Sequence, residues 1–97
     1  MIVRVVRLSL AAHHLDAFDA LFLKHRDEIQ AQPGCHSVTL MTDPADPCIR
    51  GTLSHWASEA DLNAYRASAL FGVVWPATKA LFDEAPQVWT YHVKEQG

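Results

Sequence analysis

Two hydrophobic patterns follow one another along this chain, and each change of pattern marks the end of an element. Residues 2–9 are rich in β-branched residues and alternate only partly, which is typical of a strand covered on both faces. From His13 to about Gln32, apolar positions recur every three or four residues until Pro33 and Gly34 end the pattern. The recurring positions are Phe18, Leu21, Phe22, His25 and Ile29. These segments predict a central strand followed by a long amphipathic helix.

Two segments with period-two alternation come next, Cys35–Thr42 and Cys48–Trp56. The segment 43–47 between them contains two prolines, which cannot continue a ladder, so we expect a β-hairpin. Matching the more apolar sides places on one face His36, Val38, Leu40, Ile49, Leu53 and His55. The more polar face then holds Ser37, Thr39, Arg50, Thr52, Ser54 and Trp56. A slip of one residue in this register would exchange the two faces.

The second half of the chain predicts a broken helix and a last strand. Residues 58–61 resemble a capping box, and a helical pattern follows them. A second helical pattern starts at Phe71, and Gly72 with Pro76 favours a bend near residues 68–72. Residues 87–93 are rich in strand formers. The order β-α-β-β-α-β over residues 1–97 predicts a single α+β domain of the ferredoxin-like class, with an antiparallel sheet and its helices on one face.

The composition bears on the partners of this domain. A chain of 97 residues buries only about 60–65% of its unfolded surface, and its strand patterns indicate cover on both faces of the sheet. A second copy packed on the bare sheet face would supply that cover, so we expect a homodimer. The formal charge of −3, with basic residues scattered among acids, gives no basic patch for nucleic acid or an anionic membrane surface.

The remaining composition narrows the chemistry and the location. The longest apolar run, residues 69–75, is far shorter than the roughly 20 residues that span a bilayer. Cys35 and Cys48 lack a CxxC spacing and suit reduced thiols in a cytoplasmic protein. The six histidines lack the spacing of a metal motif, and no GxSxG, GxGxxG or P-loop sequence is present. We therefore expect no metal site and no serine-hydrolase or nucleotide chemistry.

Aromatic and histidine side chains concentrate between residues 55 and 75. They are His55, Trp56, Tyr65, Phe71 and Trp75. Two interpretations remain open. Trp and Phe at helical spacing usually fill a core, whereas flat apolar walls beside a broken helix with titratable groups are also what a pocket for a flat ligand needs.

The same residues carry a family resemblance. The segments Ser54–Glu59 and Tyr65–Ser68, together with Leu62, Phe71, Trp75, Lys79, Leu81-Phe82 and the earlier Pro33–Cys35, resemble the antibiotic biosynthesis monooxygenase (ABM) domain family. The resemblance covers nearly the whole chain. It implies the dimeric α/β barrel built from ferredoxin-like domains, the fold that the element order predicts independently.

The branches of that family differ at particular positions. In the anthrone-oxidising branch, Trp56 matches a tryptophan after the third strand, whereas Thr52 and Leu62 stand in place of an asparagine and a tyrosine. In the haem-degrading branch the iron ligand is a histidine where this chain has Trp75, so iron would lack its proximal imidazole. An isomerase-like branch acting on a small signalling molecule has a histidine pattern that the second helix lacks.

The resemblance therefore implies a monooxygenase that needs no cofactor and oxidises a small aromatic substrate, quinol- or anthrone-like, with O2. The catalytic residues it implies are His55 as base, Trp56 as a wall and Tyr65 as a hydrogen-bond donor, with His36, Phe22, Phe71 and Trp75 around the substrate. An enclosed cavity of about 300 Å³ or more would accompany this function. The alternative is a small-ligand-binding or purely structural homodimeric domain without catalysis.

Overall fold

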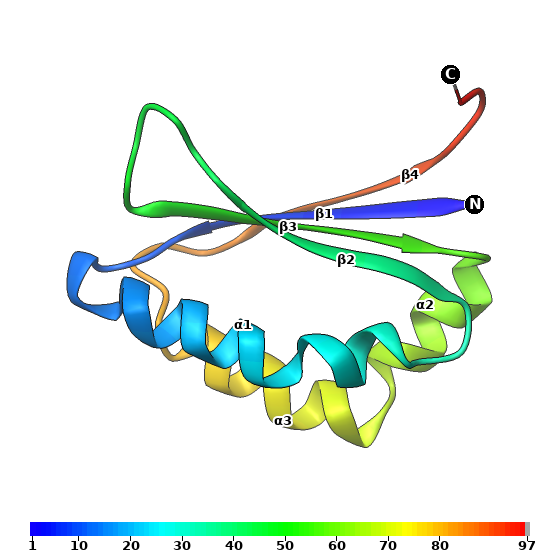
Figure 1. Ribbon diagram of the computed structural model, residues 1–97, viewed down its shortest axis with the longest axis horizontal. Helices are drawn as coiled ribbons and strands as arrows, with labels where there is room; N and C mark the ends of the chain where they lie inside the picture. Colours follow the sequence, from blue (N-terminus) through cyan, green and yellow to red (C-terminus); the bar gives the residue numbers. More distant parts are fainter. Residues whose placement is uncertain (97) are drawn as a thin grey trace.

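The computed structural model describes residues 1–96 and has the predicted element order (Figure 1). Its strands are β1 (Ile2–Ser9), β2 (Cys35–Thr42), β3 (Ile49–Trp56) and β4 (Gln87–His92). Its helices are the short 3₁₀ turn η1 (Ala12–His14), α1 (Leu15–Gln30), α2 (Glu59–Arg66) and α3 (Ala69–Lys79). All neighbouring strands are antiparallel in the order β2-β3-β1-β4. The ferredoxin-like α+β class is confirmed.

The predicted break in the second helix is confirmed, and the cap at Ser68 produces it. The Ser58 side chain accepts a hydrogen bond from the Asp61 backbone N–H and begins α2. The Ser68 side chain does the same for the Phe71 N–H and begins α3. Because each hydroxyl satisfies a donor that a helix start leaves unpaired, the chain restarts a helix at once after Ala67. Pro76 lies inside α3 and does not end it.

The hairpin register differs from the predicted one by the slip described above. Val38 pairs with Ser54 and Leu40 with Thr52, so these four side chains share the helix-facing side of the sheet with Trp56. Leu53 and His55 face the opposite, outer side. The cause is a bulge between Cys35 and Ser37, which inserts one residue and changes the parity of β2. The predicted register, which matched apolar sides, is therefore wrong.

The helices all lie on one side of the sheet, and the core fills the space between (Figure 1). One buried cluster forms around Trp56, Ile2 and Leu62, and the other around Phe18 and Leu8. Arg50 of β3 donates to both carboxylate oxygens of Asp19 on α1, at 2.9 and 3.2 Å, which ties this helix to the sheet. No helix among residues 1–96 has the length and apolar content of a membrane span.

Gly34 makes the turn from α1 into β2 and is the one described residue with positive φ, at 80°. A Cβ there would collide with the carboxyl group of Asp61 on α2. Its carbonyl also accepts from the Ala57 N–H at 2.7 Å, which holds the end of β3 against the start of β2. The residue thus sits where backbone conformation and space both require glycine.

Gly34→Ala is expected to lower the free energy of unfolding by about 2–3 kcal/mol, because it adds left-handed strain to a steric clash. Gly72→Ala is the matched control: a Cβ at Gly72 meets nothing within 4 Å, and the change should raise helix stability by about 0.5–1 kcal/mol. Urea unfolding of both variants measures the difference. Equal effects at the two positions would contradict the strain argument.

Candidate active site

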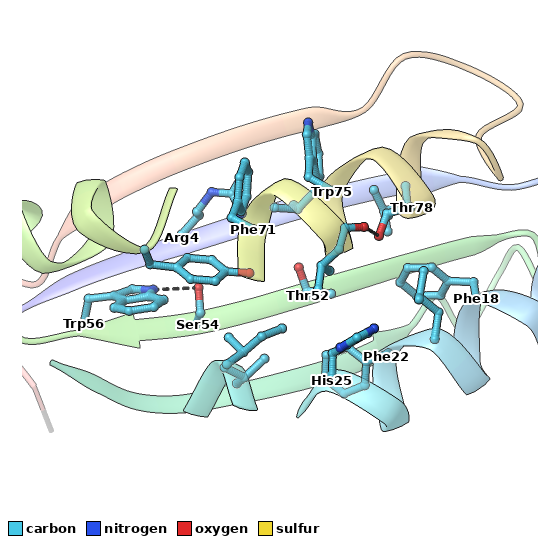
Figure 2. A pocket seen from close by; sticks show the side chains of 17 residues that line it. Arg4, Phe18, Phe22, His25, Thr52, Ser54, Trp56, Phe71, Trp75 and Thr78 are labelled. Carbon is cyan, nitrogen blue, oxygen red and sulfur yellow. Dashed lines mark hydrogen bonds between the residues drawn. The ribbon is translucent and has the colours of Figure 1, made fainter. Parts of the chain in front are cut away.

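A cavity lies between the sheet and the helices, with side chains from six elements, β1, β2, β3, α1, α2 and α3, around it (Figure 2). The helix-facing side of β1 and β3 forms its floor, and α1 and α3 form its walls. Its volume is about 70 Å³, so the predicted size of about 300 Å³ or more is wrong for the isolated chain. The reason is that aromatic rings from both the sheet and the helices extend into this space.

These rings form a continuous series along the cavity. Trp56 stacks on Tyr65 with ring centroids 5.1 Å apart, and Tyr65 meets the edge of Phe71 at 5.3 Å. Phe71 then stacks on Trp75 at 5.7 Å with an interplanar angle of 12°. The Trp56 indole is fully buried, and its Nε1–H donates to the Ser54 hydroxyl at 3.0 Å. The walls are therefore flat, apolar and held in fixed orientations, as a planar ligand requires.

Tyr65 brings a phenol into this apolar series. Burial raises the pKa of Tyr65 to about 12, against the opposing influence of the nearby positive charge of Arg4. The phenol thus keeps its proton at neutral pH and can donate a hydrogen bond to a ligand oxygen.

The raised pKa of Tyr65 predicts a loss of stability at alkaline pH. An unfolded tyrosine ionises near pH 10, whereas Tyr65 keeps its proton to about pH 12. Between these values the folded state binds a proton that the unfolded state has lost, so stability falls as the pH rises, by about 2–3 kcal/mol in total. Below pH 10 Tyr65 is protonated in both states, so it contributes no pH dependence to the stability there.

Tyr65→Phe should remove this part of the alkaline fall, whereas Tyr91→Phe, at a residue 57% exposed, should keep it. Urea unfolding of the three proteins at about pH 8 and about pH 11.5 tests the difference. The same fall in all three proteins would show that Tyr65 is not the responsible group.

His25 of α1 is the second titratable group at the cavity. It is only 8% exposed and lies on the helix face that turns toward the sheet (Figure 2). Its Nδ1 lies 3.2 Å from Oε1 of Glu28, one turn further along the helix. Because a carboxylate only accepts hydrogen bonds, this contact assigns the proton of the neutral ring to Nδ1 and leaves Nε2 as an acceptor. An imidazole arranged in this way can remove a proton from a ligand.

Arg4 of β1 places a positive charge on the cavity floor. Its guanidinium carbon lies 5.7 Å from the centroid of the Trp75 ring and 6.0 Å from that of Phe71. Burial and the positive charge of Arg66 lower the pKa of Arg4, although a guanidinium remains charged at neutral pH. The cavity therefore combines flat rings with one cation, one phenol and one imidazole.

The sequence-predicted site residues are only partly brought together. Trp56, Tyr65, Phe22, Phe71 and Trp75 all line the cavity. His55 does not, because the register places it on the outer face, where its Nδ1 lies 2.9 Å from the Ser37 hydroxyl. His36 is exposed at the bulge of β2. The predicted base, His55, and the predicted substrate contact, His36, thus cannot reach this cavity.

Among the cavity residues that the sequence analysis did not name as site candidates, Arg4 and His25 bear on its chemistry most directly. His25 shares the apolar helix face of Phe22 and Ile29, where a histidine is usually a core residue. Arg4 alternates with Ile2 and Val6 in β1, so all three side chains share one face of the strand. Once the strand is assigned, this alternation predicts that Arg4 points toward the core.

The two cysteines lie at opposite ends of the hairpin as free thiols. Burial raises the pKa of the Cys35 thiol, so the nucleophilic thiolate is disfavoured there. Among residues 1–96, no three histidine, cysteine or acidic side chains gather as a metal ion would need.

Comparison with known families places this site in context. The model of a family described as antibiotic biosynthesis monooxygenase matches residues 1–74. The chain belongs to the ABM family. The match includes Arg4, His25, Trp56, Tyr65 and Phe71 but ends before Trp75. A search among curated proteins found no match.

Solved structures share the fold of this ABM domain at low sequence identity. A conserved protein from Methanosarcina mazei Go1 is 21% identical with a TM-score of 0.90, covering 97% of this chain and 94% of that one. Rv0793 from Mycobacterium tuberculosis is 16% identical with a TM-score of 0.90, covering 98% and 96%. SnoaB, a cofactor-independent oxygenase from Streptomyces nogalater, is 16% identical with a TM-score of 0.87, covering 98% and 94%.

Proposed function

We propose that this ABM domain is a cofactor-independent oxygenase that oxidises a small aromatic, quinol- or anthrone-like substrate with O2. The observation that carries the proposal is His25, a buried imidazole whose Nδ1 is held by Glu28 and whose Nε2 is left to accept a proton beside flat aromatic walls. The family and the likeness to an oxygenase that uses no cofactor support it.

The chemistry that this site would perform begins with proton removal. His25 Nε2 takes the acidic proton of an anthrone CH2 group, and the resulting anion is rich enough in electrons to reduce O2. One oxygen atom forms a new bond to that carbon, which loses its second hydrogen as the O–O bond breaks. The carbon ends as a carbonyl, and the other oxygen atom leaves as water, so O2 receives four electrons from the substrate.

The protein's part in this sequence is positioning and proton handling. Trp56 and Trp75 bound the space for the flat ring system, and Tyr65 donates a hydrogen bond to a substrate oxygen as negative charge develops there. The apolar walls exclude water from the anion. His55, on the far side of the sheet, takes no part in this scheme.

Oxygen uptake by the purified, metal-stripped protein with a panel of anthrones and hydroquinones tests the proposal. We expect uptake that saturates with substrate, exceeds the uncatalysed rate, and is unchanged by added chelator. Uptake that matches the uncatalysed rate with every compound would contradict it. That result would favour the non-catalytic alternative, and the cavity volume of about 70 Å³ agrees with the purely structural form of it.

The outer face of the sheet supports a second part of the proposal, a homodimer through this face. None of the helices covers it (Figure 1). It exposes Trp89 and Tyr91 by 39% and 57%. Val5 and Leu53 lie half-buried beside them. A second copy of the same face would cover these side chains symmetrically.

Light scattering at micromolar concentration should give about twice the chain mass of 10.8 kDa. Trp89→Asp should give the single-chain mass, because it puts a charge into the apolar interface. Val73→Asp, at a residue 61% exposed on α3, is the matched control and should leave the dimer intact. A monomeric wild-type protein would overturn this part of the proposal.

A further inference from the structure

Arg4 differs from the two other arginines of the sheet in having no carboxylate partner. Arg7 lies 3.6 Å from Asp43, and Arg50 lies 2.9 Å from Asp19. Within residues 1–96, the Arg4 guanidinium makes no ion pair and meets instead the rings of Phe71 and Trp75. Of these three arginines, Arg4 is thus the one whose charge faces the cavity instead of a carboxylate.

The rings that accompany Arg4 stabilise its charge only in part. An aromatic face attracts a cation, but it does not replace the oxygen acceptors that the five N–H groups of a guanidinium can use. Burial first and the neighbouring charge of Arg66 second lower the pKa of Arg4, so Arg66 adds to the positive potential around it. A half-buried cation of this kind gains most from an anion that enters the same space.

We propose that Arg4 makes the cavity selective for a flat aromatic ligand that carries an anionic oxygen, a carboxylate or a phenolate, on the edge of its ring. The cavity of about 70 Å³ must widen to admit such a ring, which then contacts Phe71 and Trp75 beside Arg4, while the guanidinium forms charge-assisted hydrogen bonds with the oxyanion. The identification of this ligand as a substrate rests on the proposed function, whereas its binding does not.

Calorimetric titration under nitrogen tests the selectivity without turnover. The probes are two pairs of equal shape and different charge, benzoate with benzamide and 2-naphthoate with 2-naphthamide. We expect at least one carboxylate to bind about 10- to 100-fold more tightly than its amide. Naphtholate, obtained by raising the pH above the pKa of 2-naphthol, should bind more tightly than naphthol and extend the result to phenolates.

Three variants locate the effect. Arg4→Met keeps an unbranched stem like the aliphatic part of arginine but loses the guanidinium and its charge, and should bind acid and amide almost equally. Arg4→Lys keeps the charge and should retain part of the preference. Arg7→Met, on the same strand but facing outward, should behave as wild type. Thermal unfolding checks that each variant is folded.

Two results would overturn the inference: equal or no binding of the charged and neutral members of both pairs, or an unchanged preference in folded Arg4→Met. Failure of the proposed function would look different. A protein that prefers the carboxylates but consumes no oxygen keeps the inference and loses the oxygenase. A protein that oxidises neutral anthrones without any preference for charge does the reverse.

Discussion

His25→Gln is expected to lower the turnover rate for oxygen consumption by about 100-fold or more, the usual contribution of a positioned general base. Glutamine fills much of the same space and can still contact Glu28, but it does not accept the substrate proton. Because the ring walls are unchanged, we expect kcat to fall while the affinity for substrate changes little. Steady-state oxygen uptake and anaerobic ligand titration measure the two quantities separately.

The matched control for this prediction is His55→Gln, the same substitution on the outer face of the sheet. It should leave kcat unchanged, because His55 contacts Ser37 and not the cavity. A large loss of kcat in His55→Gln with a normal His25→Gln would reverse the assignment of the base. Thermal unfolding of both variants confirms that any loss is not a loss of fold.

The second large effect concerns stability. Trp56→Ala is expected to lower the free energy of unfolding by about 3–5 kcal/mol, since it empties the space of a fully buried indole. The change also removes the stacking on Tyr65 and leaves the Ser54 hydroxyl without its donor. A domain of this size is commonly stable by only about 5–15 kcal/mol, so the variant would be close to unfolding at room temperature.

Urea unfolding measures this loss, with Trp56→Phe and Leu23→Ala as graded comparisons. Trp56→Phe keeps a ring in the cluster and should lose less than Trp56→Ala. Leu23, on the exposed side of α1, is 59% exposed, and its truncation should cost less than about 1 kcal/mol. A Trp56→Ala protein as stable as Leu23→Ala would show that burial of the indole contributes little to the free energy of unfolding.

The element order could be predicted because each element carries its own local signal. The period of α1, the turn at Pro33-Gly34 and the cap at Ser58 are features of neighbouring residues, and local physics decides them. The break before α3 was predictable for the same reason, although the residue that makes it is Ser68 rather than Gly72 or Pro76.

The site could not be predicted to the same degree, because it depends on which face each strand residue occupies. One inserted residue at the bulge before Ser37 decides the facing of all of β2, and no composition rule reveals it. Thr52 and Ser54 look like solvent-facing residues, yet they point into the cavity. His55 looks like a base on an apolar face, yet that face is the outer one. An error of one residue in the register assigns every side chain of a strand to the wrong face of the sheet.

The distribution of the three tryptophans has a practical consequence. Trp56 and Trp75 stand in the cavity wall, whereas Trp89 stands on the outer face of β4. In Trp89→Phe, all indole emission would therefore arise from the wall of the site. A ligand that contacts these rings would change the intensity or the wavelength of the tryptophan emission, so ligand binding could be followed by intrinsic fluorescence.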